Sequence, residues 1–262
     1  MINIRATSAA FKQQARHFFA DPQWVIPSLV APFTFTIVVL MLFPAVDEPV
    51  VLYAVLGGGI LGMWGNTLYA SGWSVSFDRM NGTLESLLIT PTPMVQVVAG
   101  RAVWNTLIGL TNAAAVFVVA ELAFGTELRL EDPALFFLAL AATLLSLATV
   151  GLMLSALFVM TRSSTVLMQI LELPIYFISG AMIPVDHLPE AIQPFSYALA
   201  PTWGVDAMRQ AAGIQGTTIM GLGTGADLLV VAAITSVYLA IALYLFRRME
   251  ARARADGSLG RW

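Results

Sequence analysis

The residues of this sequence that could perform hydrolytic chemistry are few and poorly placed for it. Ser179 precedes a glycine, in an outline resembling a nucleophilic serine, but such a serine needs a general base at the same depth. The two histidines, His17 and His187, lie near the N-terminus and beyond Pro184. There is no cysteine, so disulfides and thiolate metal sites are excluded. The chain itself is not expected to be an enzyme.

Nucleotide hydrolysis by this chain is not expected either. A phosphate-binding loop needs glycines followed by a lysine and a hydroxyl. The stretch GLGTGA at 221–226 has no such lysine, and the only lysine of the chain is Lys12. The run GGGILGMWG at 57–65 lies in an apolar segment, where Gly58 and Gly62 are spaced to let two helices approach closely.

A carboxylate lies midway along one of the apolar stretches. Glu172 follows Gln169 by about one helical turn, and a buried charge there costs several kcal/mol unless it is paired, hydrated or protonated. The functional interpretation places Gln169, Glu172 and Tyr176 on a translocation path or a dimer seam. The alternative is a protonated or hydrogen-bonded contact between helices. Four other polar residues in apolar stretches predict interhelical hydrogen bonds: Asn66, Thr67, Asn105 and Asn112.

These residues belong to a chain whose solvent must be mostly lipid. Of its 262 residues, 58% are hydrophobic and 11% are charged, against about a quarter charged in a soluble domain. No basic stripe indicates a nucleic-acid partner. A crossing helix needs about 20 mainly apolar residues. Six segments qualify, at about 25–43, 51–73, 100–124, 134–160, 165–183 and 226–246. The predicted fold class is therefore an all-α, polytopic membrane protein with six transmembrane helices.

The basic residues predict the orientation. With the N-terminus inside, all of them except Arg129 and Arg209 fall on the inner side, including those of the tail at 247–262. Cytoplasmic loops collect Lys and Arg, so both termini are expected in the cytoplasm. An even number of spans agrees with that expectation.

Residues 1–24 precede the first span and predict an amphipathic helix. Its apolar residues recur at helical spacing: Ile4, Phe11, Ala15, Phe18 and Phe19. Such a helix suits the inner headgroup layer, as an interface helix, a topology anchor or both. Residues 25–262 form the predicted permease domain of six spans.

The region 184–225 is external and only moderately apolar. It contains LPEAIQPFSYALAP and PTWGVDAMRQAAG, each of which predicts one short helix. Thr202 is expected to cap the second helix and Gly213 to end it. Neither helix is long enough to cross the membrane, so both are expected to enter the outer leaflet and turn back where protein shields their ends.

The inner segment 76–93, SFDRMNGTLESLLITPTP, is charged and amphipathic between two apolar stretches. Pro91 and Pro93 stop a helix and fix the return to the third span. A short rigid helix there could transmit a push from a partner, or it could simply link two spans.

Three stretches together resemble the type-2 ABC transporter permease family, in particular its daunorubicin-resistance branch. They are FDRMNGTLESLLITPTP, GRAVWN at 100–105, and ISGAMIPVDHLPEAIQPFSYALAPTWGVDAMRQAAG. The resemblance implies that two ATPase subunits carrying ATP and Mg²⁺ dock on two permeases, either identical copies or sister chains. It also implies a prokaryotic plasma membrane, an outer re-entrant helix pair, and no cofactor in this chain. The implied coupling residues are Phe77, Asp78, Arg79, Gly82, Thr83, Leu84, Glu85 and Leu88.

The function expected from this resemblance is the permease of an ATP-driven exporter. Its cargo would be hydrophobic or amphipathic: a drug, a lipid or a glycolipid. Arg79 and Glu85 would supply contact charges, and Gly82 a hinge or a site of close approach. The alternatives are a stand-alone secondary transporter or channel, which needs repeats or broken spans at the midplane, and a membrane anchor that moves nothing.

Overall fold

The fold is known from a computed structural model, and every regular element in its described part is helical. The structure describes residues 3–20, 25–26, 30, 33–34, 37–38, 41, 48–90, 92–124, 130–160, 174–214 and 218–256. The elements are α1 (Ile4–Ala20), α3 (Glu48–Trp64), η1 (Gly65–Tyr69), α4 (Ala70–Met80), α5 (Leu84–Ile89), α6 (Met94–Phe124), α7 (Pro133–Met160), η2 (Val185–His187), α9 (Gln193–Ala198), α10 (Ala200–Ala211), η3 (Ile219–Gly221) and α11 (Thr224–Asp256).

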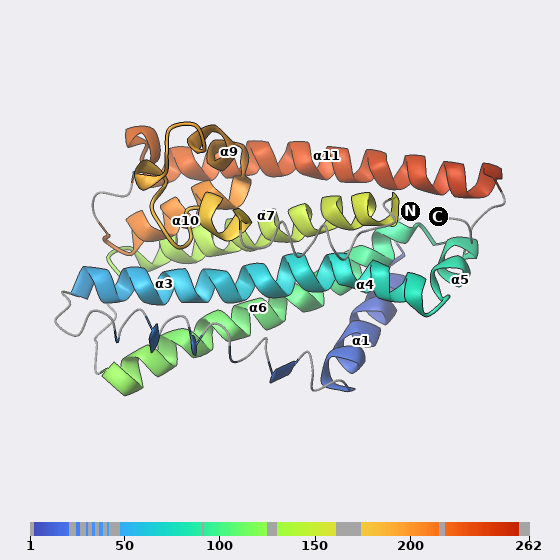
Figure 1. Ribbon diagram of the computed structural model, residues 1–262, viewed down its shortest axis with the longest axis horizontal. Helices are drawn as coiled ribbons and strands as arrows, with labels where there is room; N and C mark the ends of the chain where they lie inside the picture. Colours follow the sequence, from blue (N-terminus) through green and yellow to red (C-terminus); the bar gives the residue numbers. More distant parts are fainter. Residues whose placement is uncertain are drawn as a thin grey trace.

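In the described part of the chain, long helical rods run roughly along one axis and form the body of the molecule (Figure 1). One rod is composite, because α3, the π-helical η1 and α4 follow each other without a break. The others are α6, α7 and α11. Within the described chain, these three are long and apolar enough to cross a membrane, over Met94–Leu122, Pro133–Leu157 and Thr224–Ala251. Three of the six predicted spans, the third, the fourth and the sixth, are thereby supported.

The remaining predicted spans fare differently. The second, 51–73, lies on the composite rod, whose π-helical turn is a feature often found near functional sites. More than half of the first, 25–43, lies outside the described residues, and the described part of the fifth, 165–183, begins at Pro174. The third begins at Met94 rather than Gly100, because Arg101 is neutralised inside the protein and the helix continues through it.

The interior is apolar and glycine lets the rods approach. Trp64 and Leu56 of α3 belong to the main cluster of buried side chains, together with Leu147 of α7. A Cβ on Gly59 would meet Ala113 at 3.3 Å, so this glycine lies at the crossing of α3 and α6. Gly59 is the neighbour of Gly58, and both Gly58 and Gly62 are buried on the same helix.

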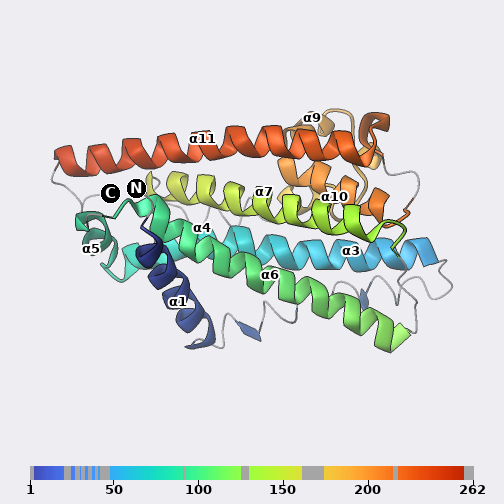
Figure 2. The same cartoon turned by 180° about the vertical axis from the view of Figure 1, so that it is seen from behind.

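The short helices α9 and α10 gather at one end of the rods, whereas α1 and α5 lie at the other (Figures 1 and 2). The ends of α4, α7 and α11, and the start of α6, lie beside α5. Figure 2 shows α1 crossing the long axis of the rods instead of following it. The N-terminal helix and segment 76–93 therefore share one end of the molecule. We call it the inner end, after the orientation that the sequence predicts.

The helix α10 confirms one predicted boundary and corrects the other. Gly213 has φ +87°, and the N–H groups of Gly213 and Ile214 donate to the carbonyls of Gln210 and Arg209, both at 3.0 Å. That pattern is a Schellman C-terminus. The predicted cap at Thr202 is wrong, because the helix begins two residues earlier, with a proline in its first turn.

Candidate functional site

The corner between α4 and α5 is built around a residue in the left-handed conformation. Gly82 has φ +68°, a conformation that only glycine adopts without strain. The chain reverses there, and the Thr83 N–H donates to the Asp78 carbonyl at 2.8 Å. A Cβ on Gly82 would meet nothing within 4 Å. The glycine is therefore required by the turn, and within the described chain nothing approaches it closely.

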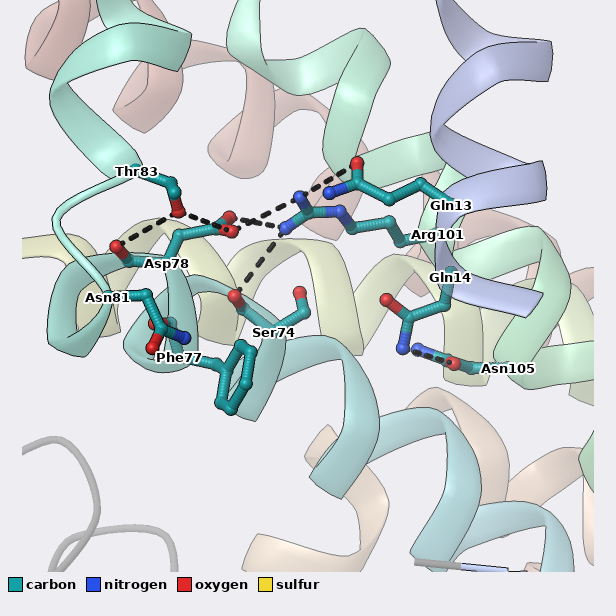
Figure 3. A network of polar contacts seen from close by, with 9 residues as sticks. All are labelled: Gln13, Gln14, Ser74, Phe77, Asp78, Asn81, Thr83, Arg101 and Asn105. Atoms are coloured by element: carbon teal, nitrogen blue, oxygen red, sulfur yellow. Dashed lines mark hydrogen bonds and ion pairs between the residues drawn. The ribbon is translucent and has the colours of Figure 1, made fainter. Parts of the chain in front are cut away.

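A buried ion pair joins α4 to α6 directly behind this corner (Figure 3). Arg101 Nη1 lies 2.5 Å from Asp78 Oδ2, and Nη2 donates to Asp78 Oδ1 at 3.3 Å. The side chains are 3% and 7% exposed. Bidentate pairing fixes both the distance and the rotation of the two helices, because the planar guanidinium matches the carboxylate.

Three further residues surround this ion pair: Gln13, Ser74 and Thr83. Together with Asp78 and Arg101 they form what we call the inner clasp (Figure 3). The Thr83 hydroxyl donates to Asp78 Oδ1 at 3.2 Å. Arg101 also donates to the Ser74 carbonyl at 3.5 Å and to Gln13 Oε1 at 3.4 Å. One guanidinium thus ties α1, α4 and the start of α5 to α6.

The helix α1 is attached to α6 at successive turns. The Asn3 N–H donates to Gln96 Oε1 at 2.9 Å, and Gln14 donates to Asn105 Oδ1 at 3.2 Å. A Cβ on Gly100 would lie 2.3 Å from the Thr7 carbonyl oxygen, so the two backbones touch. Asn105 therefore forms the predicted interhelical hydrogen bond.

The apolar residues of α1 surround one tryptophan of α6. The rings of Phe11, Phe18 and Phe19 contact Trp104 edge-on, with centroids 5.4, 6.3 and 5.8 Å away. The predicted amphipathic helix is confirmed. Its two glutamines, Gln13 and Gln14, hydrogen-bond to Arg101 and Asn105 of α6.

The predicted coupling residues divide into an inward and an outward group. Asp78 and Leu84 are buried, and Leu84 joins a cluster that includes Phe246 of α11. Phe77 is partly exposed and its ring contacts His17 of α1, at 5.8 Å between centroids. Three more lie at the surface or half-buried: Arg79, Gly82 and Thr83. The side chains of Glu85 and Leu88 lie outside the described part of the chain.

An outward-facing residue that the sequence did not single out is Met80, which is 71% exposed at the end of α4. Asn81 and Ser86, which follow it along the corner, are also exposed. An exposed apolar side chain with polar neighbours in the sequence is suited to a protein contact.

Replacing Gly82 with alanine is expected to cost about 1–2 kcal/mol through backbone strain alone, since the site has open space but a left-handed backbone. Gly225→Ala is the matched control, because its site is also open and its backbone has no positive φ. Thermal unfolding of the two variants measures the difference. Equal unfolding temperatures would contradict the role given to Gly82.

Of the three predicted path residues, the structure describes Tyr176. Gln169 and Glu172 lie outside the described residues. Tyr176 packs against the main apolar cluster, and its hydroxyl lies 3.3 Å from where a Cβ on Gly65 would be. It therefore faces the π-helical turn of the composite rod.

A second buried arginine holds the opposite end together. Arg209 of α10 is 2% exposed and donates to the carbonyls of Gly180 and Ala181 at 2.6 and 2.8 Å. Its guanidinium carbon lies 4.0 Å from the centre of the Tyr53 ring of α3. We call these residues the outer clasp. Burial lowers the pKa of Arg209, and the charge persists because free arginine titrates so high.

Two buried carboxylates lie beside the outer clasp. Asp206 accepts from the Ile219 N–H at 2.8 Å and from Gln210 at 3.0 Å, and the same Gln210 amide donates to Asp227 at 2.7 Å. Burial raises the pKa of Asp206, and the hydrogen bond from Ile219 opposes that rise. These bonds fix α10 to η3 and α11.

Comparison with known proteins identifies the family of this chain. A family model described as ABC-2 type transporter matches residues 5–212, which is most of the chain. The chain belongs to the ABC-2 type transporter family. The resemblance found in its motifs is thus confirmed, and so is its nature as a membrane transport protein. The family's membrane subunit carries no ATPase domain of its own.

Curated relatives of this ABC-2 chain match over part of their length. One is the "Probable multidrug ABC transporter permease YbhR" of Escherichia coli K12, 28% identical over 120 residues, 46% of this chain and 32% of the relative. Another is "Nodulation protein J" of Rhizobium leguminosarum bv. trifolii, 31% identical over 147 residues, 55% of this chain and 53% of the relative. The matches span about a third and about half of these relatives' lengths.

Proposed function

We propose that this chain is the membrane permease of an ATP-driven exporter, moved by separate ATPase subunits that bind its inner end. The observation that carries the proposal is the corner of α4 and α5 in a member of the ABC-2 family. The corner leaves Met80 and Ser86 exposed, while Leu84 and Asp78 anchor it to the helices behind. A partner that displaced the corner would displace those helices too.

The inner clasp is the proposed means of transmission. Arg101 lies in the first turns of a helix that could cross the membrane, and it holds α4 and α1 through Asp78 and Gln13. Packed interiors transmit displacement because they have little free volume. A push on α5 therefore tilts α4 and α6 as one body and drags α1 with them.

The proposed cargo is supported by the predicted path residues and by the name of one relative. A seam between two permeases lined by Gln169, Glu172 and Tyr176 would be mainly apolar with a few polar groups, suited to a hydrophobic or amphipathic cargo. One relative is named for multidrug transport and another for nodulation. ATP and Mg²⁺ would belong to the partner ATPases. Cargo would leave through a path closed by the outer helix pair α9 and α10.

The test is reconstitution of the permease with the ATPase subunits that co-purify with it. Vesicles containing both are expected to move a fluorescent amphipathic probe when ATP is added. The permease alone is expected to move none. Movement by the permease alone, driven by an ion gradient, would overturn the proposal in favour of a secondary transporter.

Charge reversal at Glu85 tests the docking surface. Glu85→Lys is expected to lower probe-stimulated ATP hydrolysis at least about tenfold, since reversing one charge in a desolvated contact costs several kcal/mol. Glu190→Lys is the matched control: it makes the same charge change at an exposed position at the other end of the molecule. Equal ATP hydrolysis in the two variants would remove Glu85 from the contact.

A further inference from the structure

The free side of α1 carries a row of positive charge. Arg5, Lys12 and Arg16 are separated by seven and four residues, spacings that return to the same side of a helix. All three side chains are exposed, and α1 contains no acidic residue to neutralise them. The opposite side, with Ala10 and Gln14, is the one attached to α6.

An exposed apolar strip lies next to this row. Ile4 and Phe19 are 76% and 67% exposed, and Ala15 lies between them at helical spacing. Burying such side chains in water-free surroundings would be favourable, and in the described chain most of their surface stays exposed, although one edge of Phe19 contacts Trp104. The strip and the row of cations together form a helix surface that is half apolar and half positive.

The position of α1 places this surface at the edge of the bilayer. The helix crosses the long axis of the rods (Figures 1 and 2). It touches α6 from Gln96 to Asn105, within the first turns of a candidate span that begins at Met94. That depth corresponds to the headgroup layer, where apolar side chains reach the acyl chains and cations reach phosphates.

We propose that the row formed by Arg5, Lys12 and Arg16 binds the phosphate groups of anionic lipids in the inner leaflet. Charge complementarity favours this occupant, because the row is purely cationic and borders an apolar strip that a soluble anion would leave uncovered. An acidic protein partner would likewise leave Ile4 and Phe19 exposed on the membrane side.

Bound lipid would act on the inner clasp. Gln13 and Gln14 connect α1 to Arg101 and Asn105, and the backbone of Thr7 touches Gly100. A lipid that holds α1 in the headgroup layer therefore holds the start of α6 and the guanidinium that pairs with Asp78. Anionic lipid therefore sets the position of the inner clasp as well as the affinity of α1 for the membrane surface.

The test uses the purified permease alone, so that its outcome is independent of ATP-driven transport. Phosphatidylglycerol and phosphatidylcholine are titrated onto detergent-solubilised protein, and bound lipid is counted by native mass spectrometry. The variant is Arg5→Gln/Arg16→Gln. The matched control is Arg247→Gln/Arg248→Gln, which removes two exposed charges from the inner end of α11. Free glycerol phosphate serves as the soluble anion.

The wild type is expected to prefer phosphatidylglycerol, and Arg5→Gln/Arg16→Gln to weaken that preference roughly 25-fold, at about fivefold per cation. For the control variant, the logarithm of the preference for phosphatidylglycerol should be at least half of the wild-type value. Three results would overturn the proposal: equal retention of the two lipids by the wild type, equal losses in both variants, or full competition by glycerol phosphate. Circular dichroism establishes that the variants keep their helices.

Discussion

Replacing Arg101 with methionine is expected to lower the free energy of unfolding by about 3–5 kcal/mol, because it leaves the Asp78 carboxylate buried without its partner. Asp78→Leu should cost a similar amount by stranding the guanidinium. The double variant Asp78→Leu/Arg101→Met should recover most of the loss, since an apolar pair of similar volume replaces a buried ion pair at little cost. Thermal unfolding in nanodiscs measures all three.

The same variants separate stability from transmission. The double variant should fold yet lose most ATP-driven export, because leucine and methionine lack the directional bonds to Gln13, Ser74 and Thr83 that fix the joint. Arg247→Met is the control, since it removes an exposed arginine at the same end. A double variant that exports at the wild-type rate would show that the clasp is structural only. Single variants as stable as the wild type would refute the buried pair itself.

Hydropathy predicted where the long helices lie, and glycine predicted where one short helix ends, because both are decided by local sequence. The long apolar stretches became α6, α7 and α11, because burying backbone in lipid demands complete helices. Gly213 ended α10 because a left-handed residue closes the last turn. The cap assigned to Thr202 failed because the proline before it favours the first turn of a helix and moves the start upstream.

The inner clasp could not be predicted from local pattern. Asp78 and Arg79 are adjacent on one helix and look equivalent, but one is buried and the other is half-exposed. The rotation of α4 is set by Arg101, 23 residues away. The one available signal was a cation placed in the first turns of an apolar stretch, since such a charge must find a partner. Arg209, assigned to an outer loop, carried the same signal among short apolar helices.

Removing Arg209 is expected to have the largest effect at the outer end. Its two bonds to the carbonyls of Gly180 and Ala181 are charge-assisted, and the Arg209 side chain is only 2% exposed, so its removal leaves buried acceptors without their donor. Arg209→Met should therefore destabilise the protein by about 3–5 kcal/mol. The stability of Arg209→Lys should lie between those of the wild type and Arg209→Met. One ammonium cannot reproduce the planar guanidinium, which binds two carbonyls and packs on a ring.

Tyr53 provides a test that isolates the ring from the hydrogen bonds. The Tyr53 hydroxyl is buried and has no hydrogen-bond partner in the described part of the chain, so Tyr53→Phe should be neutral or slightly stabilising. Tyr53→Leu removes the face over which the Arg209 guanidinium lies and should cost about 2 kcal/mol or more. Equal effects of phenylalanine and leucine would refute the cation–π contact.

Displacement of the outer end can be followed with a single introduced thiol, since the chain has no cysteine. Met220→Cys places that thiol at a 64% exposed position in η3, which α10 holds through Asp206 and Ile219. Because Arg209 anchors α10 to residues 180–181, Arg209→Met should loosen η3 and change the mobility of a spin label on Cys. Tyr53→Phe should leave the label unchanged. If Arg209→Met lowers stability without altering the label, the outer clasp holds the interior together but does not position the outer helix pair.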